Sequence, residues 1–179
     1  MCIIGQAVSE ANVAEAASIW ARAAARRDGR SGHTDVASAL AGIRRRLALD
    51  GATLTLARRD VRAIGFDLVA PREHVMEIFY VAVDPDVWGD GVAGLLLQDA
   101  RSRARVAGCR TLELWVIDDN HRAKAVYERA GWLSTGETQP DAASGRAERR
   151  FIRHVDALAH GRHRDSSTNA GAGRPVADA

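Results

Sequence analysis

The chain has 179 residues, of which 46% are hydrophobic and 27% charged, and its formal net charge is +2. This length suits one domain with a real hydrophobic core. The small net charge excludes a charge-driven nucleic-acid binder, and no apolar run approaches the roughly 18–20 residues of a membrane span. Two cysteines exclude a disulfide-stapled scaffold, and the first residues lack the regions of a secretory signal. We therefore expect a cytoplasmic globular protein with no nucleic-acid or membrane partner.

The first half of the chain shows helical and then strand-like patterns. Ser9 can cap a helix whose apolar positions recur at helical spacing as far as about Arg27. A second helix should end at Gly51, and three strands in hairpin-like order should follow. The expected elements are a strand at 3–8, helices at 9–27 and about 35–49, strands at 53–57 and 63–69, a turn at 71–74 and a strand at 78–83.

The second half reads as loop, helix, strand, helix and two closing strands. The expected elements are a helix ending at Gly108, a strand at 111–117, a helix from about 120 to 130 ended by Gly131, and strands at 132–136 and 149–155. Residues 156–179 show no periodicity and are interpreted as a disordered tail, which leaves a domain at 1–155. This order predicts an α+β (mixed α/β) fold, with a central, mostly antiparallel twisted sheet flanked by helices and one βαβ step.

A glycine-spaced loop, residues 88–94, joins the central strand to a helix N-terminus, which is an anion-binding arrangement. Its Gly89-x-Gly91-x-x-Gly94 spacing also spells the dinucleotide fingerprint, but a lone match is weak. The dinucleotide fold expects an acidic residue at the end of the next strand and further βα units, whereas Glu113 lies mid-strand. No Gly-Lys-Ser/Thr follows, so a Walker loop is excluded. The alternative interpretation, a tight turn that binds no ligand, is not excluded by the loop alone.

A second motif runs from Asn120 through Ala123, Tyr127 and Gly131 to Trp132. Together with the loop and the strand before it, over about residues 61–132, it resembles the GNAT family of N-acetyltransferases. The resemblance departs at Trp88, where the family usually has Gln or Arg.

The resemblance implies that acetyl-CoA is the co-substrate. The backbone of the loop would hold its pyrophosphate, and the strand before the loop would pair with its pantetheine and supply an oxyanion donor from Val81 or Val83. The implied cofactor-binding residues are Val81, Ala82, Val83, Trp88, Gly89, Asp90, Gly91, Val92, Ala93, Gly94, Asn120 and Tyr127.

Two side chains are candidates for proton transfer. Tyr127 matches the family's general acid, which protonates the departing thiolate, although a packed aromatic residue is the alternative. Glu77 matches an acidic residue that accepts the proton of the amine, and strand alternation would place Glu77, Phe79 and Val81 on one face; an ordinary charged strand end is the alternative. Asn120 suits a cofactor contact and a helix N-cap equally well.

Other polar residues have simpler interpretations. No metal site is expected, because His160-x-x-His163 has no partner cysteines, and His33, His74 and His121 are weak candidates for proton transfer. Cys109 is expected to be structural, and the arginine run at 44–46 to be a solvated helix face.

The preferred function is direct acetyl transfer, in a ternary complex, to a primary amine of a small molecule. The basic loop at 26–33 favours a neutral or acid-bearing acceptor over a polycation. The alternatives are acetylation of protein N-termini or lysines, a catalytically silent acyl-CoA-binding module and, more remotely, a dinucleotide reductase. The sequence does not decide between a monomer and a homodimer.

Overall fold

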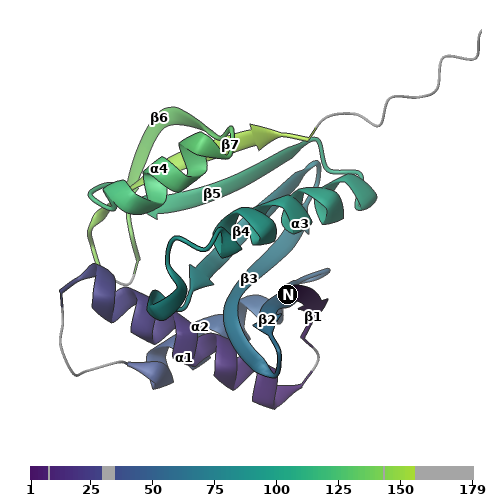
Figure 1. Cartoon of the computed structure of the whole chain (residues 1–179). Helices are drawn as coiled ribbons and strands as arrows, with labels where there is room; N and C mark the ends of the chain where they lie inside the picture. The colour runs from purple at the N-terminus through teal and green to yellow at the C-terminus, as the bar shows by residue number, and fades with distance from the viewer. Residues whose placement is uncertain (8, 30–34, 143, 156–179) are drawn as a thin grey trace, which may run out of the picture.

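The computed structural model describes residues 1–7, 9–29, 35–142 and 144–155. Its elements form one seven-stranded sheet of order β1-β2-β3-β4-β5-β7-β6, with helices on both faces (Figure 1). The elements are β1 (Cys2–Gln6), α1 (Glu10–Arg27), α2 (Val36–Leu47), β2 (Thr53–Arg59), β3 (Arg62–Arg72), β4 (Val75–Val83), η1 (Pro85–Val87), α3 (Val92–Val106), β5 (Thr111–Ile117), α4 (His121–Arg129), β6 (Leu133–Pro140) and β7 (Ala147–His154). Within it β4–β5 is the parallel pair, which confirms the predicted α+β fold.

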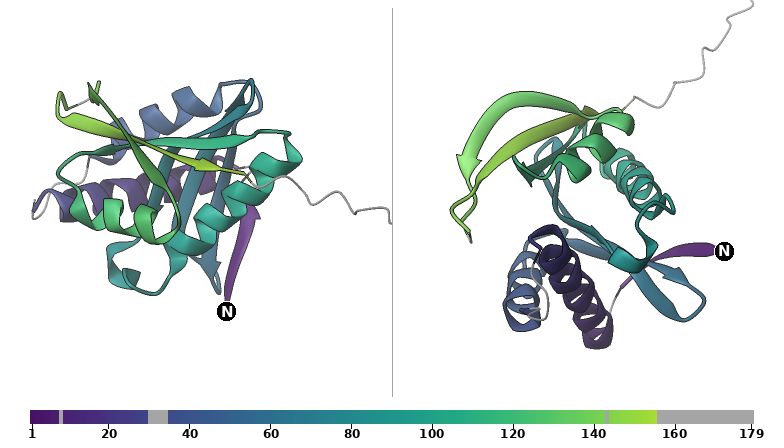
Figure 2. Two further views of the ribbon diagram at one scale, coloured as in Figure 1. Left: turned by 90° about the horizontal axis from the view of Figure 1, so that it is seen from above. Right: turned by 60° about the vertical axis from the view of Figure 1, so that its left-hand side comes forward.

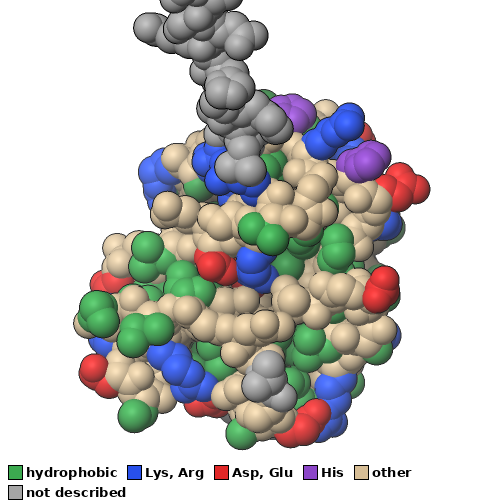
Figure 3. Space-filling model, turned by 90° about the vertical axis from the view of Figure 1, so that its right-hand side faces the viewer, with side chains coloured by type: hydrophobic (Ala, Val, Ile, Leu, Met, Phe, Trp, Pro, Cys, Tyr) green, Lys and Arg blue, Asp and Glu red, His purple; other side chains and the backbone are tan. Residues whose placement is uncertain are grey.

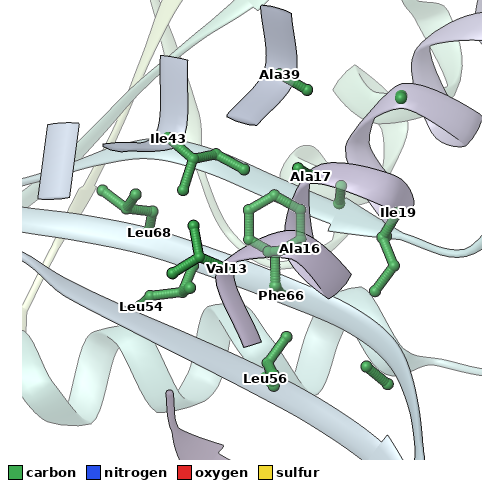
Figure 4. Packing of buried hydrophobic residues seen from close by; sticks show 13 residues of the cluster. Val13, Ala16, Ala17, Ile19, Ala39, Ile43, Leu54, Leu56, Phe66 and Leu68 are labelled. Carbon is green, nitrogen blue, oxygen red and sulfur yellow. The ribbon is translucent and has the colours of Figure 1, made fainter. Parts of the chain in front are cut away.

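Two helical layers bury the two faces of the sheet (Figure 2). Helices α1 and α2 pack on strands β2 to β4 through apolar side chains such as Ile43, Phe66 and Leu68 (Figure 4). Helices α3 and α4 pack on the other face against β4, β5 and β7. Burial of these apolar surfaces is the dominant stabilising contribution, and it fixes the central strands between the layers.

Several element boundaries differ from the sequence prediction. Ser9 is confirmed as the N-cap of α1, since its side chain accepts from the Asn12 amide. The second helix is shorter than expected and ends at Leu47, before Gly51. Pro71 lies inside β3 rather than in a turn, because it pairs with Met76. Both closing strands extend further toward their hairpin turn, and the expected tail at 156–179 lies outside the described residues.

A β-bulge changes which residues of β4 share a face. The β3–β4 register steps from Leu68↔Tyr80 to Val69↔Ile78, so Phe79 is an extra residue on β4. An extra residue shifts the alternation by one. Phe79 and Tyr80 therefore both pack toward α1 and α2, while Val81 packs toward α3 and α4. The prediction that Val81 shares a face with Glu77 and Phe79 was wrong for this reason.

The surface shows no gathering of one charge on the face drawn in Figure 3, where Lys, Arg, Asp and Glu side chains are scattered among apolar ones. In the part of the chain that the structure describes, none of the helices is long and apolar enough to span a membrane.

A buried ion pair ties α3 to the middle of the sheet. Asp67 on β3 is 1% exposed, and Nη2 of Arg103 lies 2.6 Å from both of its carboxylate oxygens. Burial raises the pKa of Asp67 to about 7, against the opposing effect of the guanidinium. Arg103 also donates to Asp99 and Thr53, so one side chain satisfies three acceptors.

The Arg103→Met variant is expected to lose about 3–5 kcal/mol of unfolding free energy at pH 8, because a buried carboxylate is left unpaired. Without Arg103 the folded-state pKa of Asp67 rises further above its unfolded value. The destabilisation should therefore shrink as pH falls toward the unfolded pKa. Urea unfolding at pH 5 and pH 8 measures this, with the Asp67→Asn/Arg103→Met double variant as the control that removes the charge. Equal losses at both pH values would contradict the assignment.

Candidate active site

The predicted phosphate loop begins α3 with an open backbone. Gly89 and Gly91 have φ angles of +104° and +80°, the left-handed region that favours glycine. Gly91 is the N-cap of α3, and no side chain caps that end of the helix. A Cβ atom on Gly89, Gly91 or Gly94 would meet nothing within 4 Å. The loop is therefore not filled by neighbouring atoms at these glycines, and the first amides of α3 lack a side-chain cap, as an anion-binding helix N-terminus requires.

The parallel strands β4 and β5 separate beside this loop. Their pairing runs from Val75↔Thr111 to Ile78↔Leu114 and then stops, although both strands continue to Val83 and Ile117. The bulge at Phe79 marks the point of separation. The second half of β4 therefore has one edge that is not paired with β5.

The register shows which amides lie on that edge. Asp84 N donates to the Ile64 carbonyl at 2.8 Å, which makes Val83↔Gly65 a non-hydrogen-bonded pair of the antiparallel ladder. Alternation then makes Ala82↔Phe66 a bonded pair and Val81↔Asp67 a non-bonded one. The N–H groups of Val81 and Val83 thus face away from β3, toward the opening, whereas that of Ala82 faces β3.

Trp88, the first residue of the loop, packs on the apolar core with its ring and contacts a cation from α4. Its indole Nε1 donates to the Val83 carbonyl at 2.8 Å, and its ring packs on the apolar cluster that includes Val92. The guanidinium of Arg122, in the first turn of α4, lies 4.4 Å from the centre of the Trp88 ring. The residue that departs from the family pattern therefore places a positive charge from α4 next to the loop.

The junction between β4 and the loop is held by a buried carboxylate. Asp84 is 2% exposed and accepts from Arg22 of α1 at 2.7 Å and from Arg62 of β3 at 2.8 Å. Both arginines also bond Asp86. Asp90, within the loop, is held by Arg59. Side chains in the loop and just before it are thus tied to α1, β2 and β3.

Tyr127 and Asn120 occupy the same helix as Arg122. Tyr127 is buried, and its ring centre lies 6.0 Å from those of Trp132 and Phe151. Burial raises its pKa above the usual range, so the hydroxyl stays protonated at neutral pH. Asn120 Oδ1 accepts from the Ala123 amide at 3.2 Å, so this residue is the N-cap of α4.

Glu77 lies in a charged cluster on the face of the sheet toward α1 and α2. Its register partner across the parallel pair is Glu113, and their side chains are 16% and 7% exposed. Arg72 approaches both carboxylates, at 3.4 and 3.6 Å, and Arg150 donates to Glu113 at 2.9 and 2.5 Å.

Desolvation raises the pKa of Glu77. The charge of Glu113 adds to this rise, while Arg72 and Arg46 oppose it. A partly desolvated carboxylate with a raised pKa is a better general base than a solvated one. Glu77, the second predicted catalytic residue, thus lies on the opposite face of the sheet from Tyr127. It is in the last paired stretch of β4 and β5, one residue before the pairing ends at Ile78.

The fold is a mixed α+β fold with a sheet that splits between β4 and β5. Beside the split lie a helix N-terminus without a side-chain cap and strand amides that β3 does not bond. This arrangement is that of an acyl-CoA-binding protein. Residues 22–132 match the model of the Acetyltransferase (GNAT) family. The chain belongs to the GNAT family of acetyltransferases.

Curated relatives and solved structures agree with this membership. The mycothiol acetyltransferase of Streptomyces coelicolor is 34% identical over 87 residues, which are 48% of this chain and 28% of that protein. That of Brachybacterium faecium is 33% identical over 104 residues, covering 54% and 31%. The chain thus spans less than a third of the length of these relatives.

Among solved structures, the Thermoplasma acidophilum PaiA N-acetyltransferase in complex with coenzyme A has a TM-score of 0.67 at 14% identity, with 86% of this chain and 99% of that chain covered. The Escherichia coli ribosomal-protein-S18-alanine N-acetyltransferase has a TM-score of 0.68 at 18% identity, covering 90% and 98%. At these identities the likeness shows the fold.

Several of the remaining polar candidates lie outside the described residues. His33, His160 and His163 lie among residues that the structure does not describe, as does the second half of the loop at 26–33. Within the described ranges, no three His, Cys, Asp or Glu side chains gather in a way that could hold a metal ion. Cys109 is buried, as a structural role predicts.

Proposed function

We propose that this chain is an acetyl-CoA-dependent N-acetyltransferase that transfers acetyl directly to a primary amine of a small molecule. One observation carries the proposal: β4 parts from β5 beside an uncapped helix N-terminus, with the amides of Val81 and Val83 turned toward the gap. This edge suits an extended thioester, and the loop at Trp88–Gly94 suits its pyrophosphate.

In this mechanism each residue has one task. The amide of Val81 or Val83 donates to the thioester oxygen as negative charge develops on it. Glu77 accepts the proton of the amine through water, so that the nitrogen can form the new bond to the acetyl carbon. As the carbon–sulfur bond breaks, the Tyr127 hydroxyl donates its proton to the departing thiolate. Asn120 caps the N-terminus of α4, the helix that carries Tyr127, and so helps to hold that helix beside the cofactor.

The ion pairs around Arg146 favour a small acceptor. Arg146, in the turn between β6 and β7, bonds Asp28 at the end of α1 at 2.8 Å and Asp119 after β5 at 2.5 Å. Arg27 and Arg146 hold the pKa of Asp28 at about 2, so the link persists across the neutral range. These pairs tie the β6–β7 turn to the end of α1. We take this link as an obstacle to a polypeptide acceptor, which would need an open groove.

A screen of amines with acetyl-CoA tests the proposal. Free thiol and the acetylated amine, identified by mass spectrometry, should appear together in equal amounts. Binding of acetyl-CoA without turnover on any amine would favour a silent acyl-CoA-binding module. Acetylation of peptide N-termini or lysines in preference to small amines would favour the protein-modifying alternative.

The Arg122→Met variant is expected to bind coenzyme A roughly twofold to fivefold more weakly. This corresponds to the loss of about 0.5–1 kcal/mol of binding free energy from one exposed ion contact. Calorimetry with coenzyme A measures the effect. Arg129→Met removes a charge from the other end of the same helix and should change nothing, while Trp88→Phe should keep the aromatic support. Equal affinities for the native chain and Arg122→Met would contradict the role given to the Trp88–Arg122 contact.

A further inference from the structure

The face of the sheet that carries Glu77 also holds a cation, Arg46, that has no carboxylate of the described residues within ion-pair distance. Arg46, near the end of α2, lies with its guanidinium carbon 5.5 Å from the centre of the Phe79 ring and 5.2 Å from that of Tyr80. Its Nη1 donates to the Tyr80 hydroxyl at 3.3 Å and to the Gly42 carbonyl at 3.5 Å. Among the described residues no carboxylate oxygen lies within 4.0 Å of its guanidinium, although the charge of Glu77 acts on it from further away. A partly buried guanidinium with spare donors is suited to an anion.

The support under Arg46 is rigid. A Cβ on Gly42 would lie 2.5 Å from the Tyr80 hydroxyl, so this ring fits only because α2 has a glycine there. Trp20 of α1 holds the other side of the ring, edge-on, at 4.7 Å. Phe79 is the bulged residue of β4. The guanidinium is thus positioned in advance, which lowers the entropy lost when it binds an anion.

This cation is a neighbour of the proposed base. Arg46 acts on Glu77 through its charge and opposes the rise of its pKa, and both side chains lie on the face of the sheet toward α2. The rest of the arginine run behaves differently: Arg44 pairs with Glu10 and Arg45 is exposed. The face therefore offers, side by side, a carboxylate that can take a proton from an amine and a fixed guanidinium that can hold an anion.

From this juxtaposition we infer that the acceptor carries a carboxylate close to its amine, as an α-amino acid does. The amine faces Glu77, and the carboxylate pairs with Arg46. A polycationic amine would instead place a second positive charge beside Arg46, which is unfavourable. The inference rests on the proposed acetyl transfer and narrows its acceptor to amino-acid-like amines.

The test compares matched acceptors on the full chain: L-amino acids, each with its carboxamide and its decarboxylated amine. Thiol release gives kcat/KM, corrected for the fraction of unprotonated amine. The acids should be preferred by at least about tenfold, expressed mainly in KM, as expected for a charged hydrogen bond. Arg46→Met should abolish this preference, and Arg46→Lys should restore part of it. Arg45→Met, which removes the same charge one residue away, should leave every rate unchanged.

The outcomes separate the inference from the function on which it rests. A preference for carboxamides or simple amines over the acids would overturn the inference but not the proposed acetyl transfer. A preference for the acids that persists in Arg46→Met would do the same. Turnover of none of the three classes, with acetyl-CoA bound, also overturns it. Absence of acetyl-CoA binding would instead overturn the proposed function. Partial recovery in Arg46→Lys distinguishes a lost anion contact from a misfolded helix.

Discussion

Replacing Glu77 with Gln is expected to lower kcat/KM for the acceptor amine by a factor on the order of 10² to 10⁴, the usual contribution of a general base. The amide keeps the size of the side chain and loses the ability to accept the proton. Steady-state kinetics with saturating acetyl-CoA measure the loss. Glu73→Gln is the matched control, because Glu73 is exposed in the turn between β3 and β4 and should not affect the rate. A Glu77→Gln variant with native activity would exclude the role of base.

The pH profile gives an independent readout of Glu77. The base must be ionised, so kcat/KM should fall as pH drops through its pKa. Desolvation and the neighbouring Glu113 raise that pKa, so the acidic limb should lie above the value of about 4.3 for an ordinary glutamate. The limb should move down in Glu113→Gln, which removes the adjacent charge. An unchanged limb in both Glu77→Gln and Glu113→Gln would assign it to another group.

Tyr127→Phe is expected to lower kcat on the order of 10²-fold, because the leaving thiolate then lacks its proton donor. The change removes only the hydroxyl oxygen, so the contacts of the ring with Trp132 and Phe151 remain. Affinity for coenzyme A and the melting temperature should therefore stay close to native. Because burial keeps this hydroxyl protonated well above neutral pH, it should add no alkaline limb in the neutral range.

Two outcomes would contradict this role for Tyr127. An unchanged kcat in Tyr127→Phe would reduce the residue to a core aromatic. A large fall in melting temperature would show that the hydroxyl is structural, since the ring alone would then not sustain the packing.

The parts of the site that depend on local chemistry were predictable from sequence. Ser9 and Asn120 are confirmed N-caps because a cap needs only its own side chain and the next turn of helix. The open loop follows in the same way from Gly89 and Gly91, since their φ angles demand glycine. The order of strands and helices was sufficient to predict the mostly antiparallel sheet with its one parallel pair.

The parts that depend on distant partners were not predictable. Glu77, Phe79 and Val81 look like a regular alternation, because the sequence of β4 does not show that β3 leaves Phe79 unpaired. The arginines at 44–46 look alike, and only the rings of Phe79 and Tyr80 select Arg46. Asp84 meets Arg22 and Arg62, which are 62 and 22 residues away in the chain.

Calorimetric titration of acetyl-CoA into the native chain and into two valine variants tests most directly whether the loop at 88–94 binds the cofactor. Gly91 and Gly108 lie at opposite ends of α3, with similar φ angles of +80° and +73°, and a Cβ atom at either position would meet nothing within 4 Å. Valine costs about 1–3 kcal/mol of backbone strain at either site. Acetyl-CoA is expected to bind the native chain and Gly108→Val, NADH is expected not to bind, and Gly91→Val is expected to lose at least about tenfold in affinity for acetyl-CoA. Binding of NADH instead, or equal loss of acetyl-CoA affinity in the two variants, would contradict the assignment of this loop to coenzyme A.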